Sequence, residues 1–266
     1  MTTSSDMKTT IHPTAVIDDN VDLGPGVTVG PHAVLHGPSK FGEGSAIDAH
    51  AVVHSYTILG PHCRLHSGAV VGDVPQDLEF EPCESFVRIG ADTVLREHVT
   101  VHRGTKPGTE TTIGDGCYLM CGSHVAHNCA VGNQVILVNQ ALLAGYVTVG
   151  DGALLSGHIA VHQFGRVGRL AMMGGHSGAS LDVPPFCTTR PFSLNQLLGL
   201  NVVGLRRAGI EAGQRRAIKA AYRILFTEKR IREDAVGLIQ AEYPAGPAFE
   251  MAAFVAASKR GVCRPE

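Results

Sequence analysis

Residues 113–148 read IGDGCY LMCGSH VAHNCA VGNQVI LVNQAL LAGYVT, six successive blocks of six residues that each begin with an aliphatic side chain. Stepping by six in both directions from this stretch, the same register runs from Ile11 to Met173. It contains 28 positions, and three of them are not large apolar residues: Asp77, Cys83 and Pro107. A repeat of this length organises most of the chain and has to be interpreted before any single motif.

Two further residue classes accompany the repeat. A mostly small residue stands two positions before the apolar one, as in Ala15, Ala33, Ser45, Ala51, Thr57, Cys63, Ala69, Thr93, Cys117, Ser123, Cys129, Ala141 and Ala153. Glycine often follows the apolar position, as in Gly24, Gly30, Gly42, Gly60, Gly72, Gly90, Gly114, Gly132 and Gly150. This period matches neither a helical face nor simple strand alternation. We predict a triangular parallel β-solenoid with coils of about 18 residues, in which apolar residues point inward, small residues fill the corners and glycine relieves strain at the turns.

The composition agrees with a narrow core and limits the possible functions. Of 266 residues, 44% are hydrophobic but only 5% are aromatic, as expected if stacked aliphatic side chains leave no room for rings. The net charge of −2 argues against a dedicated nucleic-acid-binding protein. There is no apolar run of about 18 residues, so we expect no membrane span, and the N-terminus lacks the apolar stretch of a secretory signal. Seven Cys, an odd number, favour a reduced, cytoplasmic location.

Two segments interrupt the repeat. Residues 73–86 and 103–112 are polar and contain Pro or Gly, so we predict loops that leave the coil there. The hexads end at DVPPF (182–186), where two prolines oppose further strand pairing. We therefore divide the chain into a β-solenoid over residues 1–189 and a helical domain over residues 190–266.

The C-terminal part differs in periodicity and in charge. Apolar residues recur at helical spacing near residues 211–226, 231–241 and 248–258. Residues 1–186 carry 9 Lys and Arg against 17 Asp and Glu, a balance of −8, whereas residues 187–266 carry 13 against 7, a balance of +6. The basic residues cluster in one region: Arg206, Arg207, Arg215, Arg216, Lys219, Arg223, Lys229, Arg230 and Arg232. Such a cluster either attracts an acidic protein or a phosphate-bearing substrate, or is an ordinary solvated helix surface.

The motif HVAH supplies the best candidates for chemistry. His124 and His127 flank the inward Val125 and so place two imidazoles outside the coil, where a neighbouring solenoid could help to line a cleft. One alternative is a zinc-dependent hydratase, since three His residues can hold a catalytic zinc. The chain does not reproduce the pair of His five residues apart that is typical of trimeric β-helix carbonic anhydrases. We predict no metal site and no cofactor, and a thiol mechanism has little support because Cys residues fall in the small-residue class.

Eight stretches together resemble the UDP-N-acetylglucosamine acyltransferase family, which begins lipid A synthesis in Gram-negative bacteria. They are HPTA (12–15), QDL (76–78), VTVHRGT (99–105), HVAHNC (124–129), AVHQF (160–164), GGHSG (174–178), DVPPF (182–186) and NVVGLRR (201–207). The resemblance implies a left-handed parallel β-helix with a C-terminal helical domain, and a homotrimer with active sites between subunits. It also implies transfer of a 3-hydroxyacyl group from acyl carrier protein to the 3-hydroxyl of the glucosamine ring of UDP-N-acetylglucosamine.

The resemblance assigns roles to single residues. His127 matches the family's general base, a role suited to imidazole because it titrates near neutral pH, and the backbone N–H of Gly145 matches the group that stabilises the oxyanion. Substrate-contacting positions are matched by Gln76, Asp77, His124, Tyr146, Gln163, Asn201 and Arg207, the last of which meets the nucleotide. Met172 and Gly175 match positions at the acyl chain, where a glycine leaves the groove open for longer chains. The basic C-terminal cluster matches the surface that receives the acidic carrier.

Four positions depart from the family pattern: Glu79 stands in place of Lys, Tyr146 in place of His, Val203 in place of Glu, and Ala208 in place of a second Arg. Asn128 also replaces an Asp of some members. The acceptor could therefore be a modified UDP-amino sugar with a 3-amino group, or another nucleotide sugar. A scaffold without chemistry is disfavoured by the 73–86 loop and by HVAH. The later N-acyltransferase of the same pathway carries an N-terminal uridine-binding domain, for which hexads that begin at Ile11 leave no room.

Overall fold

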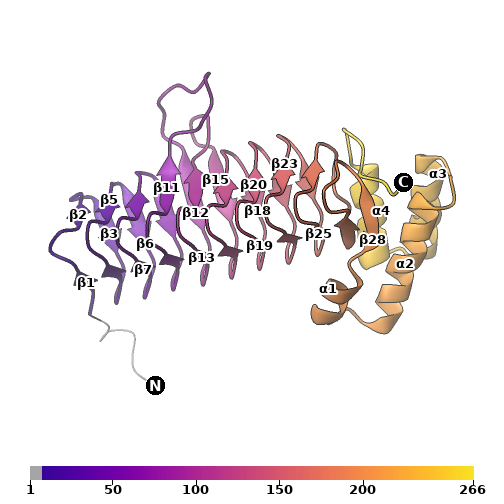
Figure 1. The fold of residues 1–266 in the computed structure, drawn as a ribbon, viewed down its shortest axis with the longest axis horizontal. Coiled ribbons are helices and arrows are strands. Elements are labelled where there is room, and N and C mark those ends of the chain that lie inside the picture. The colour runs from indigo at the N-terminus through magenta and orange to yellow at the C-terminus, as the bar shows by residue number, and fades with distance from the viewer. Residues whose placement is uncertain (1–7) are drawn as a thin grey trace.

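The computed structural model describes residues 8–266, which form a triangular prism of three sheets followed by helices (Figure 1). Sheet A contains β1 (Thr10–Ile11), β4 (Thr28–Val29), β7 (Ala46–Ile47), β10 (Arg64–Leu65), β13 (Val94–Leu95), β16 (Tyr118–Leu119), β19 (Ile136–Leu137), β22 (Leu154–Leu155), β25 (Met172–Met173), β27 (Cys187–Thr189) and β28 (Leu197–Leu200). Sheet B contains β2 (Val16–Ile17), β5 (Val34–Leu35), β8 (Val52–Val53), β11 (Val70–Asp73), β14 (Thr100–His102), β17 (His124–Val125), β20 (Leu142–Leu143), β23 (Ala160–Val161) and β26 (Gly178–Ala179). Sheet C contains β3 (Val21–Leu23), β6 (Ser39–Phe41), β9 (Thr57–Leu59), β12 (Phe86–Ile89), β15 (Glu110–Ile113), β18 (Ala130–Val131), β21 (Thr148–Val149) and β24 (Arg166–Val167).

The core consists of the apolar residues that define the repeat. Val101, Val125 and Leu143 lie in register on successive strands of sheet B, and each is 0% exposed. The small residues that precede the strands are buried as well, so large and small side chains alternate through the interior. Among residues 8–266, Phe41 and Phe186 are the only Phe or Tyr side chains that are buried. The scarcity of rings is therefore a consequence of a core that is only one coil wide.

The corners of the prism correct one part of the prediction. Gly30 and Gly42, which follow apolar positions, do not have positive φ; instead, a β-carbon on them would lie 2.8 and 2.4 Å from backbone atoms of the next coil. Left-handed φ occurs three residues after the apolar position, as at His32 (57°) and His158 (56°). Most of these glycines therefore permit close stacking of coils, and Gly72 (φ 84°) is the exception that relieves backbone strain as predicted. The left-handed corner conformation is carried mainly by other residues, often His, Asn, Gln or an aromatic.

Two segments project together from one edge of the prism (Figure 1). Residues 74–85 lie between β11 and β12, and residues 103–109 lie between β14 and β15. The Gly108 N–H donates to the carbonyl of Glu84 at 2.9 Å, which joins the two segments. The guanidinium of Arg103 lies 5.5 Å from the ring centre of Tyr56 and 5.8 Å from that of Phe80. These cation–π contacts fasten the longer segment to the coil below it.

The prism ends differently in different sheets. Sheet C stops at the prolines, after a bridge between Val167 and Val183. Sheet A continues beyond them, because β27 pairs in parallel with β25 and β28 then returns antiparallel to β27. The prediction that the prolines end strand pairing is therefore wrong for sheet A.

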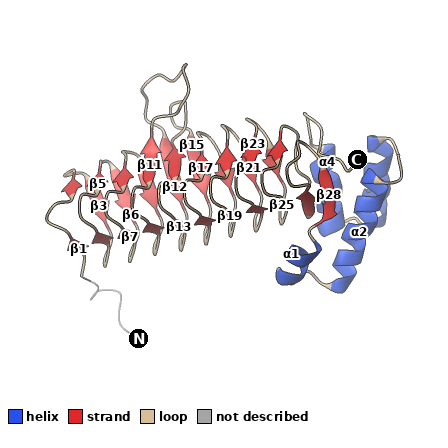
Figure 2. Ribbon diagram, in the orientation of Figure 1, coloured by secondary structure: helices blue, strands red, loops and turns tan. Residues whose placement is uncertain are grey.

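Four helices follow the sheets (Figure 2): α1 (Val202–Arg207), α2 (Ala212–Phe226), α3 (Arg232–Glu242) and α4 (Pro247–Ala256). The last three agree closely with the helical segments predicted from apolar spacing. The first was not predicted as a helix. In the part of the chain that the structure describes, no helix has the length and apolar character required to cross a membrane.

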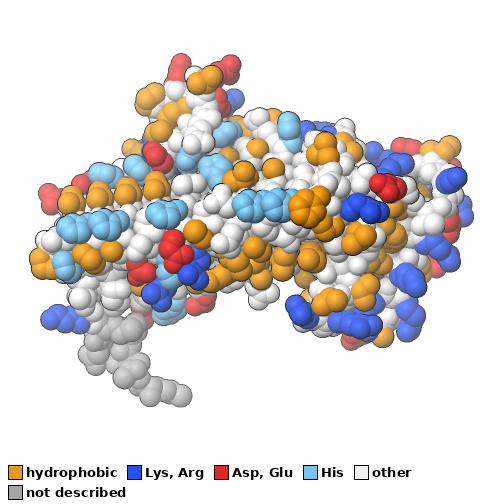
Figure 3. Space-filling model, viewed as in Figure 1, with side chains coloured by type: hydrophobic (Ala, Val, Ile, Leu, Met, Phe, Trp, Pro, Cys, Tyr) orange, Lys and Arg blue, Asp and Glu red, His pale blue; other side chains and the backbone are white. Residues whose placement is uncertain are grey.

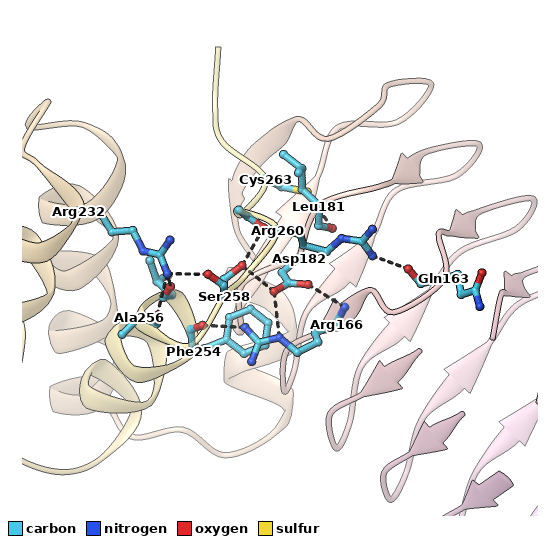
Figure 4. A network of polar contacts seen from close by, with 12 residues as sticks. Gln163, Arg166, Leu181, Asp182, Arg232, Phe254, Ala256, Ser258, Arg260 and Cys263 are labelled. Atoms are coloured by element: carbon cyan, nitrogen blue, oxygen red, sulfur yellow. Dashed lines mark hydrogen bonds and ion pairs between the residues drawn. The ribbon is translucent and has the colours of Figure 1, made fainter. Parts of the chain in front are cut away.

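A buried carboxylate fixes the helices to the end of the prism (Figure 4). Asp182 is 1% exposed, and its Oδ2 accepts hydrogen bonds from Nε of Arg166 at 2.9 Å and from Oγ of Ser258 at 2.7 Å. The Arg166 guanidinium also donates to the carbonyl of Phe254 at 2.8 Å and lies 4.2 Å from the centre of its ring. Since both partners of Asp182 are themselves held, α4 and the segment after it have a defined position relative to sheet C.

Candidate active site

A groove of about 620 Å³ lies on the outer face of sheet B. It is lined by Gln76, His124, Ala126, His127, Leu142, Leu143, Ala144, Gly145, Ala160, Val161, His162, Gln163, Gly178, Ala179, Ser180 and Leu194. The outward residues of four neighbouring strands form its floor in register: His124, Leu142, Ala160 and Gly178. Side-chain size falls from Leu142 to Gly178, and Leu194 stands at the far end. An apolar channel with imidazoles at one end suits a chain-like ligand whose reacting group is polar.

His127 has a defined orientation at the corner between sheets B and C. It is 7% exposed, and its Nδ1 lies 3.0 Å from Oδ1 of Asn128. The backbone N–H of Thr105 donates to the same oxygen at 3.1 Å, which identifies that atom as the amide oxygen rather than the nitrogen. Because an amide oxygen only accepts hydrogen bonds, Nδ1 of His127 carries the proton. Nε2 therefore has the free lone pair that a general base requires.

The hydrogen bonds around Asn128 extend to a tyrosine. The Thr105 hydroxyl donates to Oδ1 of Asn128 at 2.9 Å, and the Tyr146 hydroxyl lies 2.9 Å from the same threonine oxygen. Since the threonine proton is directed to Asn128, Tyr146 is the donor in the second contact. The Tyr146 ring packs edge-on against His127, with ring centres 5.3 Å apart, and stacks on Phe164 at 4.8 Å. The 103–109 segment and two coils thus hold the imidazole from one side.

Gly145 lies directly against the His127 ring. A β-carbon at position 145 would be 2.3 Å from Cε1 and 2.6 Å from Nε2 of His127, so only glycine fits beside this imidazole. The Gly145 carbonyl accepts a hydrogen bond from the Phe164 N–H at 2.9 Å. Within residues 8–266, the N–H of Gly145 donates to no protein acceptor. A backbone donor is therefore available next to the basic nitrogen of His127.

His124 is a neutral neighbour of His127. Its Nδ1 lies 2.7 Å from the Thr100 hydroxyl, and its ring centre is 5.0 Å from that of His102 in an edge-on arrangement. Burial is the main cause that lowers the pKa of His124 to about 4, and the nearby His102 and His127 contribute to the same shift. Burial also lowers the pKa of His102. Near pH 7 both rings are uncharged, so neither opposes the transfer of a proton to His127.

Comparisons with known proteins decide the family. The sequence profile of Udp N-acetylglucosamine O-acyltransferase, Domain 2, matches residues 182–263, and that of the bacterial transferase hexapeptide (six repeats) matches residues 110–145. An acyl-(acyl-carrier-protein)–UDP-N-acetylglucosamine O-acyltransferase of Alkalilimnicola ehrlichii is 46% identical over 258 residues, which cover 96% of this chain and 100% of that protein. The chain belongs to the UDP-N-acetylglucosamine O-acyltransferase family. This confirms the resemblance inferred from the motifs.

Other members of this acyltransferase family agree in sequence or fold. A Synechocystis protein with the same name is 44% identical over 170 residues, which cover 64% of this chain and 61% of that protein. The solved UDP-N-acetylglucosamine acyltransferase of Francisella novicida superimposes with a TM-score of 0.91 at 29% identity, covering 96% of this chain and 94% of that one. The solved UDP-N-acetylglucosamine acyltransferase of Campylobacter jejuni superimposes with a TM-score of 0.90 at 34% identity, covering 96% of this chain and 100% of that one. The predicted left-handed parallel β-helix with C-terminal helices is confirmed.

The site residues predicted from this acyltransferase family fall into two groups. Five of them line the sheet B groove: Gln76, His124, His127, Gly145 and Gln163. Asp77 and Tyr146 line a second hollow of about 490 Å³, most of whose lining belongs to the projecting segments and includes Glu79, Glu81 and Lys106. These seven residues therefore share one edge of the prism, between sheets B and C.

The second group lies elsewhere on the protomer. Met172 belongs to β25 in sheet A, and Gly175 lies in the turn that leads from sheet A to sheet B. Asn201 caps α1, where its Oδ1 accepts from the Gly204 N–H at 2.9 Å and its Nδ2 donates to the Leu170 carbonyl at 2.9 Å. Arg207 is the exposed last residue of α1. Within one protomer, none of these four residues lines the groove.

The sequence analysis did not assign roles to several residues in and around the sheet B groove. Thr105 and Asn128 orient His127, although Asn128 was noted only as a departure from the family pattern. His102 stands beside His124, and His162 lines the groove. Thr105 and His102 belong to the VTVHRGT motif and His162 to AVHQF, so the motifs could have found them. Their hydrogen-bond partners come from other coils and could not be read from spacing.

Proposed function

We propose that this protein transfers a 3-hydroxyacyl group from acyl carrier protein to the 3-hydroxyl of UDP-N-acetylglucosamine, the reaction expected to begin lipid A synthesis, with His127 as general base. The observation that carries the proposal is the pairing of an unprotonated Nε2 on His127 with an unused N–H on Gly145. The names of the relatives, which specify this donor and this acceptor, support it. An acyl transfer to a hydroxyl needs these two functions side by side.

In the proposed mechanism, Nε2 of His127 takes the proton of the sugar hydroxyl while its oxygen attacks the thioester carbon. The carbonyl oxygen gains a negative charge and accepts a hydrogen bond from the Gly145 N–H. The intermediate then collapses, the carbon–sulfur bond breaks, and the leaving thiolate receives the proton from the His127 imidazolium. The products are the 3-O-acyl sugar nucleotide and carrier protein with a free thiol, and no proton is lost or gained overall.

We propose a homotrimer in which sheet A of one subunit faces sheet B of the next. This arrangement would bring the second group of residues, Met172, Gly175, Asn201 and Arg207, to the groove that holds His127. The outer faces of the sheets support it. Sheet A presents a row of half-buried apolar residues in register: Val94, Tyr118, Ile136, Leu154 and Met172. Sheet B presents another apolar row, in which Val16 is exposed and Val34, Val52 and Val70 are half-buried. Sheet C presents mostly charged or polar residues: Asp22, Lys40, Arg88, Thr112, Thr148 and Arg166.

The acyl carrier protein is proposed to dock on the helical end. Figure 3 shows Lys and Arg side chains gathered over this part of the molecule. A hollow of about 560 Å³ between α1 and α2 is lined by four basic side chains, Arg206, Arg215, Arg216 and Lys219, around an apolar base that includes Leu205. Such a surface combines attraction for an acidic partner with apolar area to bury.

A 3-amino acceptor is a second candidate, and one observation favours it. The hollow next to Tyr146 contains three carboxylates, Asp77, Glu79 and Glu81, but only one cation, Lys106, among its lining residues. Both acceptors carry the same diphosphate, but a 3-amino group can be protonated, so an acidic hollow attracts it more than a 3-hydroxyl group. The product separates the two cases, because mild alkali cleaves an ester and leaves an amide intact.

The decisive assay offers purified protein a panel of nucleotide sugars and acyl carriers and identifies products by mass. We expect acylated UDP-N-acetylglucosamine, and we expect His127→Ala to lower turnover about 10²–10⁴-fold while its melting temperature stays close to that of the wild type. Unchanged turnover in that variant would reject the mechanism.

Metal analysis of chelator-washed, active protein tests the zinc-dependent alternative. Cell fractionation tests the proposed cytoplasmic location, which the seven free thiols support, and limited proteolysis tests the proposed division near residue 189.

A further inference from the structure

The C-terminal segment returns to the active-site groove. After α4, Nη1 of Arg260 donates to the carbonyl of Gln163 at 2.5 Å (Figure 4). Its Nη2 lies 3.3 Å from Nδ1 of His162. Both contacted residues line the groove. Arg260 and Gln163 are 97 positions apart in the chain, and nothing in the hexad pattern predicts this contact.

Arg260 contacts a turn that is connected to the proposed catalytic groups. The turn is closed by a hydrogen bond from the Gly165 N–H to the His162 carbonyl at 2.9 Å. Its Phe164 N–H donates to the carbonyl of Gly145 at 2.9 Å, and the Phe164 ring stacks on Tyr146. The turn therefore sets the direction of the Gln163 side chain, and its bond to the Gly145 carbonyl holds the peptide between Gly145 and Tyr146.

The segment that carries Arg260 is itself anchored. The Asp182 N–H donates to the Gly261 carbonyl at 3.0 Å, the Cys263 N–H donates to the Asp182 carbonyl at 2.8 Å, and Ser258 bonds the Asp182 carboxylate at 2.7 Å. Asp182 is almost completely buried. Arg260 thus extends from a rigid base, and its half-buried guanidinium can restrain what it contacts.

We propose that Arg260 is a positioning residue for acyl transfer: it holds the 162–165 turn so that Gln163 faces the nucleotide sugar. The inference rests on the proposed function. Arginine suits the role because its planar guanidinium can reach the Gln163 carbonyl and the His162 ring at once, whereas a lysine has one ammonium for both. Lys259, its exposed neighbour, lines the same hollow as Phe164. Within residues 8–266 its ammonium forms no hydrogen bond or ion pair with the turn, so it supplies a matched control.

The test compares Arg260→Gln, Arg260→Lys and Lys259→Gln in steady-state assays with UDP-N-acetylglucosamine and acyl carrier protein. We expect Arg260→Gln to lower kcat/KM for the nucleotide sugar at least about tenfold, Arg260→Lys to recover only part of it, and Lys259→Gln to stay within about twofold. In a Gln163→Ala background the further effect of Arg260→Gln should be clearly smaller, because the two residues act through one turn. Fully additive losses would overturn the proposal.

A second measurement is independent of activity. Hydrogen exchange should show faster exchange of the Phe164 and Gly165 amides in Arg260→Gln than in Lys259→Gln, with the amides of sheet B unchanged. If the wild type has no transferase activity, the proposed function is rejected, but the exchange measurement still shows whether Arg260 holds the turn. Unchanged exchange in the turn, or faster exchange throughout the protein, would reject the positioning role.

Discussion

Gly145 and His127 are in such close contact that a single methyl group at position 145 would overlap the imidazole: the β-carbon would lie 2.3 Å from Cε1. The φ of Gly145 is not in the left-handed region, so glycine is required here by the neighbouring side chain rather than by the backbone. The pair fixes the distance between the proposed base and the proposed oxyanion donor. Substitutions at either position therefore test the same geometry.

Gly145→Ala should displace the His127 ring and lower kcat by about 10²-fold or more, since small misplacements of a catalytic group have large effects on rate. Steady-state kinetics with UDP-N-acetylglucosamine provide the test. The double variant Gly145→Ala/His127→Ala gives the control. With the imidazole removed, the added methyl group has space, so the decrease in melting temperature that Gly145→Ala causes in the wild type should largely disappear. If Gly145→Ala keeps wild-type kcat, the two groups do not act together.

Asn128 should determine which nitrogen of His127 is basic. Asn128→Leu removes the acceptor at Nδ1, so we expect kcat to fall by about 10²-fold as the ring loses its fixed tautomer and orientation. Asn128→Asp keeps the acceptor and adds a negative charge, which stabilises the imidazolium, so activity should be retained and the acidic limb of the pH–rate profile should move to higher pH. Equal activity in the Asn128→Leu variant and the wild type would show that Asn128 has no part in the mechanism. A substitution of Thr111 supplies the control, because the Thr111 hydroxyl accepts a hydrogen bond from the backbone N–H of Asn128 and does not contact its side-chain amide.

The contrast between the hexads and this site shows what a sequence alone can reveal. The repeat predicted the sheets and the core because each apolar residue contacts its counterparts one coil away, which is a relationship of fixed spacing. The contact between Thr105 and Asn128 joins a loop to a corner 23 positions later, and the contact between Arg260 and Gln163 joins the last residues to the prism. Neither follows from a period. The corner glycines were predicted correctly by position but not by cause, because coil-to-coil distances are needed to see the overlap that excludes a β-carbon.

The buried His124 should make the protein less stable in mild acid. An unfolded His has a pKa near 6.5, whereas the folded pKa of His124 is about 4. Between these values the unfolded chain binds more protons, so the free energy of unfolding falls as the pH drops from about 6.5 to about 4. Burial lowers the pKa of His54 and His102 as well, and they act in the same direction.

Urea unfolding at pH 7 and at pH 4.5, at one protein concentration, measures this effect. Between pH 7 and pH 4.5, the free energy of unfolding of the wild type should fall by roughly 1–2 kcal/mol more than that of His124→Gln. This figure is smaller than the full pKa shift of His124 implies, because the ring is only partly buried. The variant should keep a weaker pH dependence, since His54 and His102 remain. Identical losses in the two proteins would show that His124 is already charged, or equally exposed, in the folded state.

Mixed trimers test whether one site takes residues from two subunits. His127→Ala removes the proposed base on the sheet B side, and Arg207→Glu reverses a charge on the α1 side, so each homotrimer should have little activity. Trimers assembled from both chains contain some interfaces in which the Arg207→Glu chain contributes sheet B and the His127→Ala chain contributes sheet A and α1. Such an interface has a wild-type His127 on one side and a wild-type Arg207 on the other, so its site would be intact. With random mixing, about a quarter of the interfaces are of this kind, so co-expression should restore roughly that fraction of wild-type kcat. Complementation between His127→Ala and Gly145→Ala, which lie on the same side, should give none. Absence of recovery in the first mixture, with trimers present by light scattering, would mean that Arg207 does not reach the partner's groove.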